Sequence, residues 1–82
     1  MRLDKFLKLS RIIKRRTVAN QVCDGGRVKV NGKSAKPAHT LKEGDIITIA
    51  FGDREISARV LSVDEKLARK DPKALYEGAE LD

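Results

Sequence analysis

The sequence has few of the residues that disulfides, metal sites and aromatic stacking platforms require. Its 82 residues include one cysteine, one histidine and three aromatic side chains, Phe6, Phe51 and Tyr76. Cys23 has no partner for an internal disulfide, and a single free cysteine is typical of a reducing compartment. Cys23 and His39 cannot complete a four-ligand zinc site without several carboxylates. We therefore expect no bound metal and no cofactor.

Long apolar runs are also absent. No stretch approaches the roughly 18 consecutive apolar residues of a membrane span. Charged residues interrupt the N-terminal segment from Arg2 to Lys8, which leaves no apolar region of the kind that a signal peptide needs. The length corresponds to one domain, which buries only roughly 60% of its unfolded surface. These features predict a small cytoplasmic protein without a deep catalytic cleft.

Recognisable catalytic groups are missing as well. A nucleophile needs a base within hydrogen-bond reach, yet His39 lies in a Pro-Ala-His-Thr loop without an evident serine or cysteine partner. Cys23 lies on a predicted apolar helix face, where a free cysteine behaves as a small hydrophobic residue. No Gly-x-x-x-x-Gly-Lys phosphate loop is present. We therefore expect a protein that is not an enzyme.

The sequence does contain an uneven distribution of charge. The net charge is +6, but residues 1–42 hold twelve lysines and arginines against two acids, a balance of +10. Residues 43–82 hold six lysines and arginines against ten acids, a balance of −4. A basic half joined to an acidic half indicates that the first half binds a polyanion.

Two short helices are predicted in the basic half. Residues 2–10 follow a helical period, with Leu3, Phe6 and Leu7 on one face. Residues 16–24 form the second helix, which ends at Gly25-Gly26 because glycine adopts the left-handed cap conformation without a steric penalty. The expected apolar side of this second helix consists of Val18, Ala19, Val22 and Cys23.

Strands follow the helices. Residues 27–30 alternate in polarity, and Asn31-Gly32 is a strong type I′ hairpin signal with a returning strand over residues 33–36. Residues 46–51 read as a buried strand and residues 54–63 as a final one. The predicted fold is α+β, with two antiparallel helices packed on a small antiparallel sheet over residues 1–63. Residues 64–82 are expected to form a short C-terminal extension, partly ordered or a tail.

The basic residues lie in rows along these elements. Lys14, Arg15 and Arg16 fall at the start of the second helix, whose unpaired N–H groups already favour an anion. The other rows come from the first helix and from the hairpin, which together predict a single cationic surface. With Phe6 and Phe51 assigned to the core, stacking is not expected, so binding would depend on phosphates and shape in folded RNA or on a DNA backbone.

Several motifs resemble those of the S4 RNA-binding domain. They occur in order and at the expected spacing over residues 2–51, and they read Arg2-Leu3-Asp4-Lys5-Phe6-Leu7, Lys14-Arg15-Arg16, Gly25-Gly26-Arg27-Val28, Val30-Asn31-Gly32-Lys33 and Lys42-Glu43-Gly44-Asp45-Ile46. The resemblance implies a helix pair on a small sheet, with the helices and the following hairpin holding structured RNA. It implies RNA contacts by Arg2, Lys5, Lys8, Ser10, Arg11, Lys14, Arg15, Arg16, Asn20, Arg27, Lys29 and Lys33.

The length and the opening residues further resemble the free-standing S4-domain factors of ribosome-associated quality control (the RqcP family), which are similar in their core to bacterial heat-shock protein 15. The short acidic end, residues 77–82, favours the former. The resemblance implies binding, as a monomer and away from membranes, to a large ribosomal subunit blocked by peptidyl-tRNA. Contacts to rRNA and tRNA would support alanine tailing by an RqcH-type factor. The alternatives are a general binder of structured RNA or tRNA, and an RNA-binding accessory subunit of an RNA-modifying enzyme.

Overall fold

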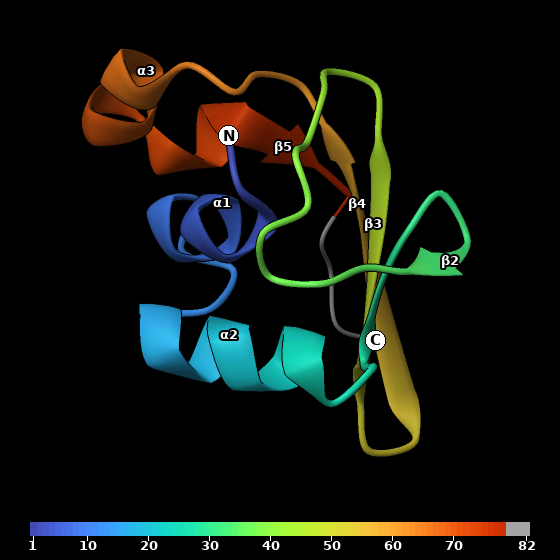
Figure 1. The fold of residues 1–82 in the computed structure, drawn as a ribbon. Coiled ribbons are helices and arrows are strands. Elements are labelled where there is room, and N and C mark those ends of the chain that lie inside the picture. The colour runs from blue at the N-terminus through green and yellow to red at the C-terminus, as the bar shows by residue number, and fades with distance from the viewer. Residues whose placement is uncertain (79–82) are drawn as a thin grey trace.

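The computed structural model describes residues 1–78 and contains three α-helices, one 3₁₀ helix and a five-stranded sheet (Figure 1). In chain order the elements are α1 (Leu3–Leu9), α2 (Arg16–Asp24), β1 (Val28–Val30), β2 (Lys33–Ser34), β3 (Ile46–Phe51), β4 (Arg54–Val60), α3 (Glu65–Lys70), the 3₁₀ helix η1 (Pro72–Leu75) and β5 (Tyr76–Glu77). Of the acidic stretch 77–82, residues 79–82 lie outside the described part of the chain. No helix among residues 1–78 is long and apolar enough to cross a membrane.

The sheet is antiparallel throughout, with strand order β2-β1-β3-β4-β5. All three α-helices lie on one face of it, and α1 is seen nearly end-on above α2, which lies across the view (Figure 1). The opposite face of the sheet carries no helix formed by residues 1–78. This arrangement confirms the predicted α+β class with helices packed on a small antiparallel sheet.

The core lies between the helices and the covered face of the sheet. The predicted apolar face of α1 is confirmed, because Leu3, Phe6 and Leu7 are fully buried. From the sheet, alternate residues of β1, β3 and β4 reach the same core, as the two-residue period of a strand requires. On α2 the buried stripe is narrower than predicted: Ala19 and Cys23 are buried, whereas Val18 is 42% exposed.

The β1–β2 hairpin has the predicted turn. Asn31 and Gly32 both adopt positive φ, 53° and 84°, as a type I′ turn requires. The returning strand is shorter than expected and ends at Ser34. Ala35 is buried and still donates its N–H to the Val28 carbonyl, and the buried Pro37 follows two residues later. The chain therefore leaves the sheet edge early and runs past the start of α1, where the Pro37 and His39 carbonyls accept the N–H groups of Asp4 and Leu3.

Two predictions about β3 and its neighbour are wrong in detail. β3 is buried on one side only, since Ile47 and Ile49 are each 1% exposed whereas Ile46, on the other side, is 36% exposed. Phe51 shares the face of Ile47 and Ile49 but is the last residue of β3, next to the turn into β4, where it is 38% exposed, so it is not the core residue that was expected. β4 ends at Val60 rather than near residue 63, because the N–H groups of Leu61 and Ser62 turn to the Leu75 carbonyl.

The segment after β4 is folded onto the domain and does not form a loose tail between residues 64 and 77. Asp64 caps α3 by accepting the Lys66 N–H at 2.9 Å, as an N-cap aspartate does. The predicted proline start at Pro72 opens η1, where Leu75 is fully buried. β5 then pairs with β4, so that this segment completes both the core and the sheet.

This packing predicts that Leu75 contributes strongly to stability. Leu75→Ala should lower the free energy of unfolding by about 2–5 kcal/mol, because it opens a cavity in the core. Leu61→Ala is the matched control, since Leu61 is 42% exposed, and it should change the free energy by less than about 0.5 kcal/mol. Urea unfolding followed by circular dichroism measures both. Equal effects of the two substitutions would contradict the packing of η1 against the core.

Candidate nucleic-acid interface

A buried carboxylate organises the junction between α1 and α2. Asp4 is 1% exposed, and its two oxygens accept hydrogen bonds from both helices. Arg2 donates through Nε and Nη2, each at 3.1 Å, and the Lys5 backbone N–H donates at 2.7 Å. Asn20 Nδ2 donates from α2 at 3.3 Å, and Arg16 Nη2 lies 3.5 Å from Oδ1. A buried charge is stable only with such a complete set of partners.

The arginines around Asp4 remain partly in solvent. The side chains of Arg2 and Arg16 are each 49% exposed, so each guanidinium has donors left for a ligand. Asn20 was expected on the exposed side of α2, but it is half-buried and its amide donates to Asp4. Asn20 therefore acts first as a positioning residue for the carboxylate. The arrangement holds two arginines, from two helices, at one place on the surface.

The pKa of Asp4 reflects this environment. Burial alone would raise the pKa, because desolvation disfavours the charged form. The hydrogen bonds from Arg2, Asn20 and the Lys5 backbone, together with the charge of Arg16, outweigh burial and hold the pKa of Asp4 below its ordinary value. Asp4 is therefore ionised at neutral pH and attracts both guanidinium groups.

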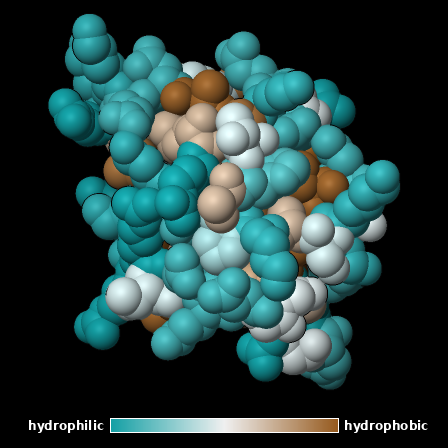
Figure 2. All heavy atoms as spheres, viewed as in Figure 1, coloured by the Kyte–Doolittle hydropathy of each residue, from teal (hydrophilic) through white to brown (hydrophobic). Residues whose placement is uncertain are grey.

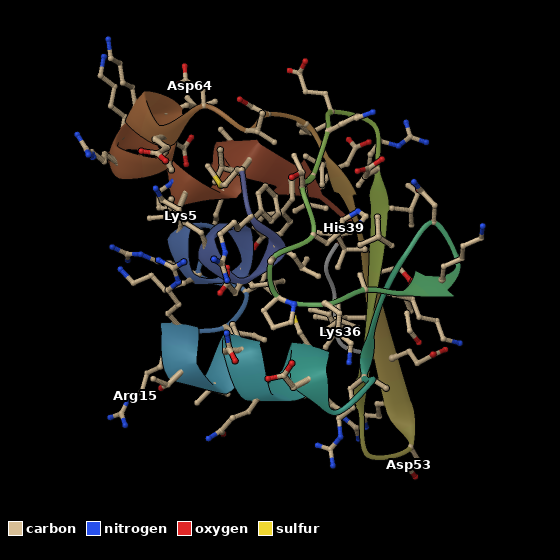
Figure 3. The ribbon with its side chains drawn as sticks, in the orientation of Figure 1. Lys5, Arg15, Lys36, His39, Asp53 and Asp64 are labelled. Carbon is tan, nitrogen blue, oxygen red and sulfur yellow. The ribbon has the colours of Figure 1, made fainter. Side chains whose placement is uncertain are left out.

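The start of α2 adds backbone donors to this site. α2 begins at Arg16, and no side chain caps its first turn, so N–H groups at this end remain available. Arg15 at the N-cap extends away from the body of the protein (Figure 3). Arg16, Thr17, Asn20 and Gln21 line a shallow hollow of about 370 Å³ beside this end. An anionic oxygen placed here can accept from both backbone and guanidinium donors.

The other cations predicted on α1 and its turn lie apart from the Asp4 cluster. Lys5 lies between α1 and α3 and forms an ion pair with Glu65 (Figure 3). Lys8, Arg11 and Lys14 line a separate groove. Ser10 is fully buried and its hydroxyl donates to the Leu7 carbonyl, so it is a residue of the turn and lies away from the surface.

The hairpin cations do not all join the helix surface. Lys29 of β1 pairs with Thr48 of β3, and both lie on the face of the sheet opposite the buried Val28 and Val30. Lys33 of β2 pairs instead with Val30. Paired residues share a face, so Lys29 points to the uncovered side of the sheet. Arg27 lines a hollow with residues of α2. The basic residues of the first half therefore occupy several faces, which corrects the expectation of a single cationic surface.

A hydrogen-bond network holds the hairpin tip. Asn31 Nδ2 donates to Asp45 at 3.0 Å, while Asn31 Oδ1 accepts the Ile46 N–H at 2.9 Å. Asp45 also accepts the Lys42 N–H at 2.9 Å, and this bond lowers the pKa of the Asp45 carboxyl. Sequence reasoning treated Val-Asn-Gly-Lys and Gly-Asp as separate motifs. The only signal in the sequence that the two turns belong together was that both motifs are parts of the same S4 pattern, in order and at the expected spacing.

Cys23 and His39 are the remaining side chains that sequence analysis considered for chemistry. Cys23 is buried on α2, and desolvation, with smaller effects of Asp4 and Asp24, raises the pKa of its thiol to about 11. It is therefore a thiol at neutral pH and a poor nucleophile. His39 is exposed in its loop. Residues 1–78 contain no cluster of three or more histidine, cysteine or acidic side chains that could hold a metal ion.

Hydrophilic side chains cover most of the face seen in Figure 2, and apolar atoms form only small patches there. The two arginines gathered at the helix junction, Arg2 and Arg16, form a basic patch of the kind that binds polyanions. A family model described as the S4 domain matches residues 1–47, more than half of the chain. The chain therefore belongs to the S4 domain family.

Within that family, two curated relatives and one solved structure are close to this chain. It is 48% identical to the RQC P-site tRNA stabilizing factor of Halalkalibacterium halodurans and 49% identical to that of Streptococcus pneumoniae. Each alignment covers 94% of this chain and 88% of the relative. The trimeric structure of Vibrio cholerae heat shock protein 15 matches with a TM-score of 0.83 at 30% identity, over 96% of this chain and 81% of the other.

The Asp4 cluster predicts a specific pH dependence of stability. Asp4→Asn should lower the free energy of unfolding by about 1–3 kcal/mol at neutral pH, because an amide places a donor against the donors of Arg2 or Asn20. The pKa of Asp4 is lowered in the folded protein, so its contribution is complete above the unfolded value near 3.8 and is lost as the pH falls through the folded value.

Urea unfolding of both proteins between about pH 2 and pH 7 measures this difference. The gap between wild type and Asp4→Asn should close at the acid end. A gap that stays constant across the range would show that the ionised carboxylate does not stabilise the fold.

Proposed function

We propose that this protein is a factor of ribosome-associated quality control that binds the large ribosomal subunit blocked by peptidyl-tRNA. In this role it contacts rRNA and tRNA and supports alanine tailing of the stalled chain by an RqcH-type factor. The proposal is supported by relatives of nearly equal length that are named RQC P-site tRNA stabilizing factor. The observation that carries it is the pair of arginines, Arg2 and Arg16, held by the buried Asp4.

The proposed mechanism is positional and involves no catalysis. Arg2 and Arg16 approach from different helices, and the open first turn of α2 adds backbone N–H donors beside them. A guanidinium matches the geometry of a phosphate and remains charged at all physiological pH values. Because Asp4 holds both side chains before binding, little side-chain entropy is lost when a phosphate docks. The site therefore favours one fixed placement of a folded RNA backbone.

Two other functions use the same surface: a general binder of structured RNA or tRNA, and an RNA-binding subunit of a modifying enzyme. Cross-linking in cells followed by RNA sequencing separates them from the proposed function. Joint enrichment of large-subunit rRNA and tRNA supports the ribosomal role. Enrichment of tRNA alone favours the general binder, and a stoichiometric enzyme in the purified complex favours the accessory subunit.

Arg16 is predicted to be essential for binding. Arg16→Ala should abolish co-sedimentation with large ribosomal subunits carrying peptidyl-tRNA, because it removes the guanidinium at the α2 start. The fold should persist, since Asp4 keeps its bonds to Arg2, Lys5 and Asn20. Arg54→Ala, on the β3–β4 hairpin, makes the same change of charge away from the site and should bind normally. Full ribosome binding by Arg16→Ala would refute the proposed interface.

The affinity is also predicted to depend steeply on salt. Each neutralised phosphate contributes about −0.7 to −0.9 to the slope of log K against log salt concentration. With Arg2, Arg15 and Arg16 each contacting a phosphate, the slope should be steeper than about −2. Fluorescence anisotropy with a labelled tRNA, titrated at several potassium chloride concentrations, measures it. A slope near zero would point to an interface that does not depend on phosphate contacts.

A further inference from the structure

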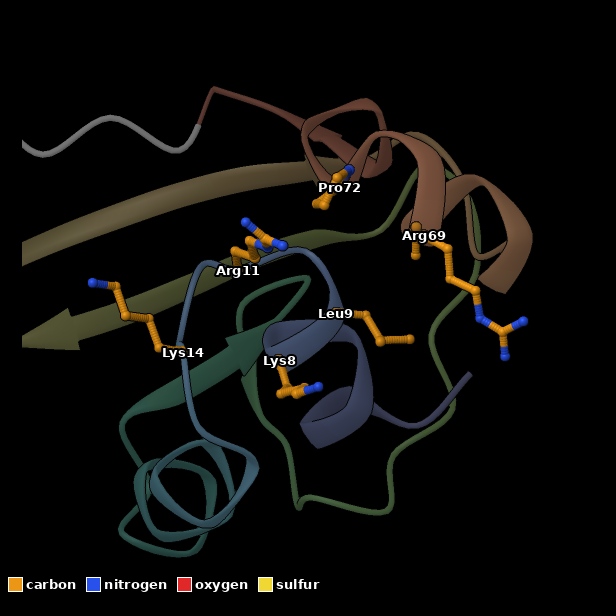
Figure 4. Close-up of a pocket in the computed structure, with 7 residues that line it drawn as sticks. Lys8, Leu9, Arg11, Lys14, Arg69 and Pro72 are labelled. Atoms are coloured by element: carbon orange, nitrogen blue, oxygen red, sulfur yellow. The ribbon is translucent and has the colours of Figure 1, made fainter.

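A second cationic groove lies between the α1–α2 turn and α3, away from the Asp4 cluster (Figure 4). Its volume is about 450 Å³. The residues that line it are Lys8, Leu9, Arg11, Lys14, Ala68, Arg69 and Pro72. Arg11 and Lys14 lie on the turn, and Arg69 lies across from them on α3 (Figure 4). Two segments more than fifty residues apart in sequence therefore share one basic groove.

Contacts within the fold hold the two walls of the groove in place. Arg11 adopts a φ of 63°, a left-handed conformation that is uncommon for a residue other than glycine. The turn around it is held by the buried Ile13, whose N–H donates to the Leu7 carbonyl at 3.0 Å. On the opposite wall, Ala68 is buried and the Lys5–Glu65 ion pair joins α3 to α1. Both walls are therefore fixed relative to each other.

Within the described part of the chain, the cations of this groove form no ion pair, although the charge of Arg69 acts on Glu65 one turn earlier on α3. Among residues 1–78, no carboxylate oxygen lies within 4.0 Å of the charged groups of Lys8, Arg11, Lys14 or Arg69. Arg2 and Arg16, in contrast, share the charge of Asp4. Four cations around an open groove, with an apolar floor that includes Leu9 and Pro72, attract an extended polyanion.

We propose that this groove is a second site for the RNA backbone, completed by Arg69 of α3. Its ligand is the phosphodiester chain of a second RNA segment, with phosphates on Arg11, Lys14 and Arg69. This inference rests on the proposed function and extends it, because two separate phosphate sites allow one small domain to join two RNA segments. Binding of both segments raises the overall affinity through effective concentration.

The two sites are far enough apart to bind different phosphates. Arg2 precedes the first turn of α1 and Lys8 lies in its last turn, about 9 Å further along the helix axis at 1.5 Å per residue. The groove and the hollow at the start of α2 share no lining residue, so the two sites hold their phosphates with different side chains. A helix that the charge balance placed in the acidic half thereby contributes to RNA binding.

The test compares Arg69→Glu with Lys70→Glu. Both substitutions make the same change of charge on adjacent residues of α3, but Lys70 does not line the groove. Each variant is measured against two probes by anisotropy or sedimentation: an unmodified tRNA transcript and large ribosomal subunits carrying peptidyl-tRNA. Circular dichroism and thermal melting check that both variants fold, and Arg69→Ala provides a milder change should Arg69→Glu unfold.

Arg69→Glu should weaken binding to the subunits about tenfold or more, whereas Lys70→Glu should remain within about threefold of wild type. Arg69→Ala should make the salt slope shallower by about one, as the loss of one phosphate contact does. If Arg69→Glu and Lys70→Glu bind every probe that the wild type binds with equal affinity, the groove is not an RNA-binding site.

The outcomes separate this inference from the proposed function. If the wild type binds subunits and the two variants, Arg69→Glu and Lys70→Glu, bind them with equal affinity, the groove proposal is refuted and the proposed function stands. Binding of the wild type to tRNA but not to subunits, with the difference present, overturns the ribosomal role and supports the groove. A wild type that binds neither probe overturns both.

Discussion

The buried carboxylate of Asp4 is the interaction on which the site formed by Arg2 and Arg16 depends. An ionised group with 1% exposure must find its hydrogen bonds inside the protein, and Asp4 takes them from α1, from α2 and from the backbone. The Asp4 N–H in turn donates to Pro37, which fastens the loop before β3 to the start of α1. One anion in the interior thereby fixes the positions of two cations at the surface, Arg2 and Arg16.

Local patterns made most of the fold predictable. The helical spacing of Leu3, Phe6 and Leu7 identified the buried face of α1, because side chains three and four residues apart share a face. Asn31-Gly32 identified the hairpin, since few other pairs accept two positive φ angles. Arg16 was correctly placed at the start of α2. In each case the determining interactions lie within a few residues of one another.

The features that sequence reasoning missed depend on contacts between distant residues. Asn20 has a helix position that reads as exposed, but its partner Asp4 lies sixteen residues earlier. Lys29 alternates correctly along β1, yet only the placement of all helices on one sheet face determines which side it points to. Ser10 reads as a surface residue, because nothing local reveals that the turn closes over it. Packing decided each of these positions.

The charge balance of the two halves shows why charge counted along the chain differs from charge on a surface. Residues 43–82 sum to −4, yet four of their six cations lie between Lys66 and Lys73. Of these, Arg69 of α3 lines the groove beside the α1–α2 turn, and the acidic residue Glu65 of α3 is paired with Lys5. Asp53 and Glu55 lie instead at the β3–β4 hairpin, at the far end of the sheet from α3 (Figure 3). Folding therefore adds C-terminal cations to the basic side of the molecule and keeps those acids away from it.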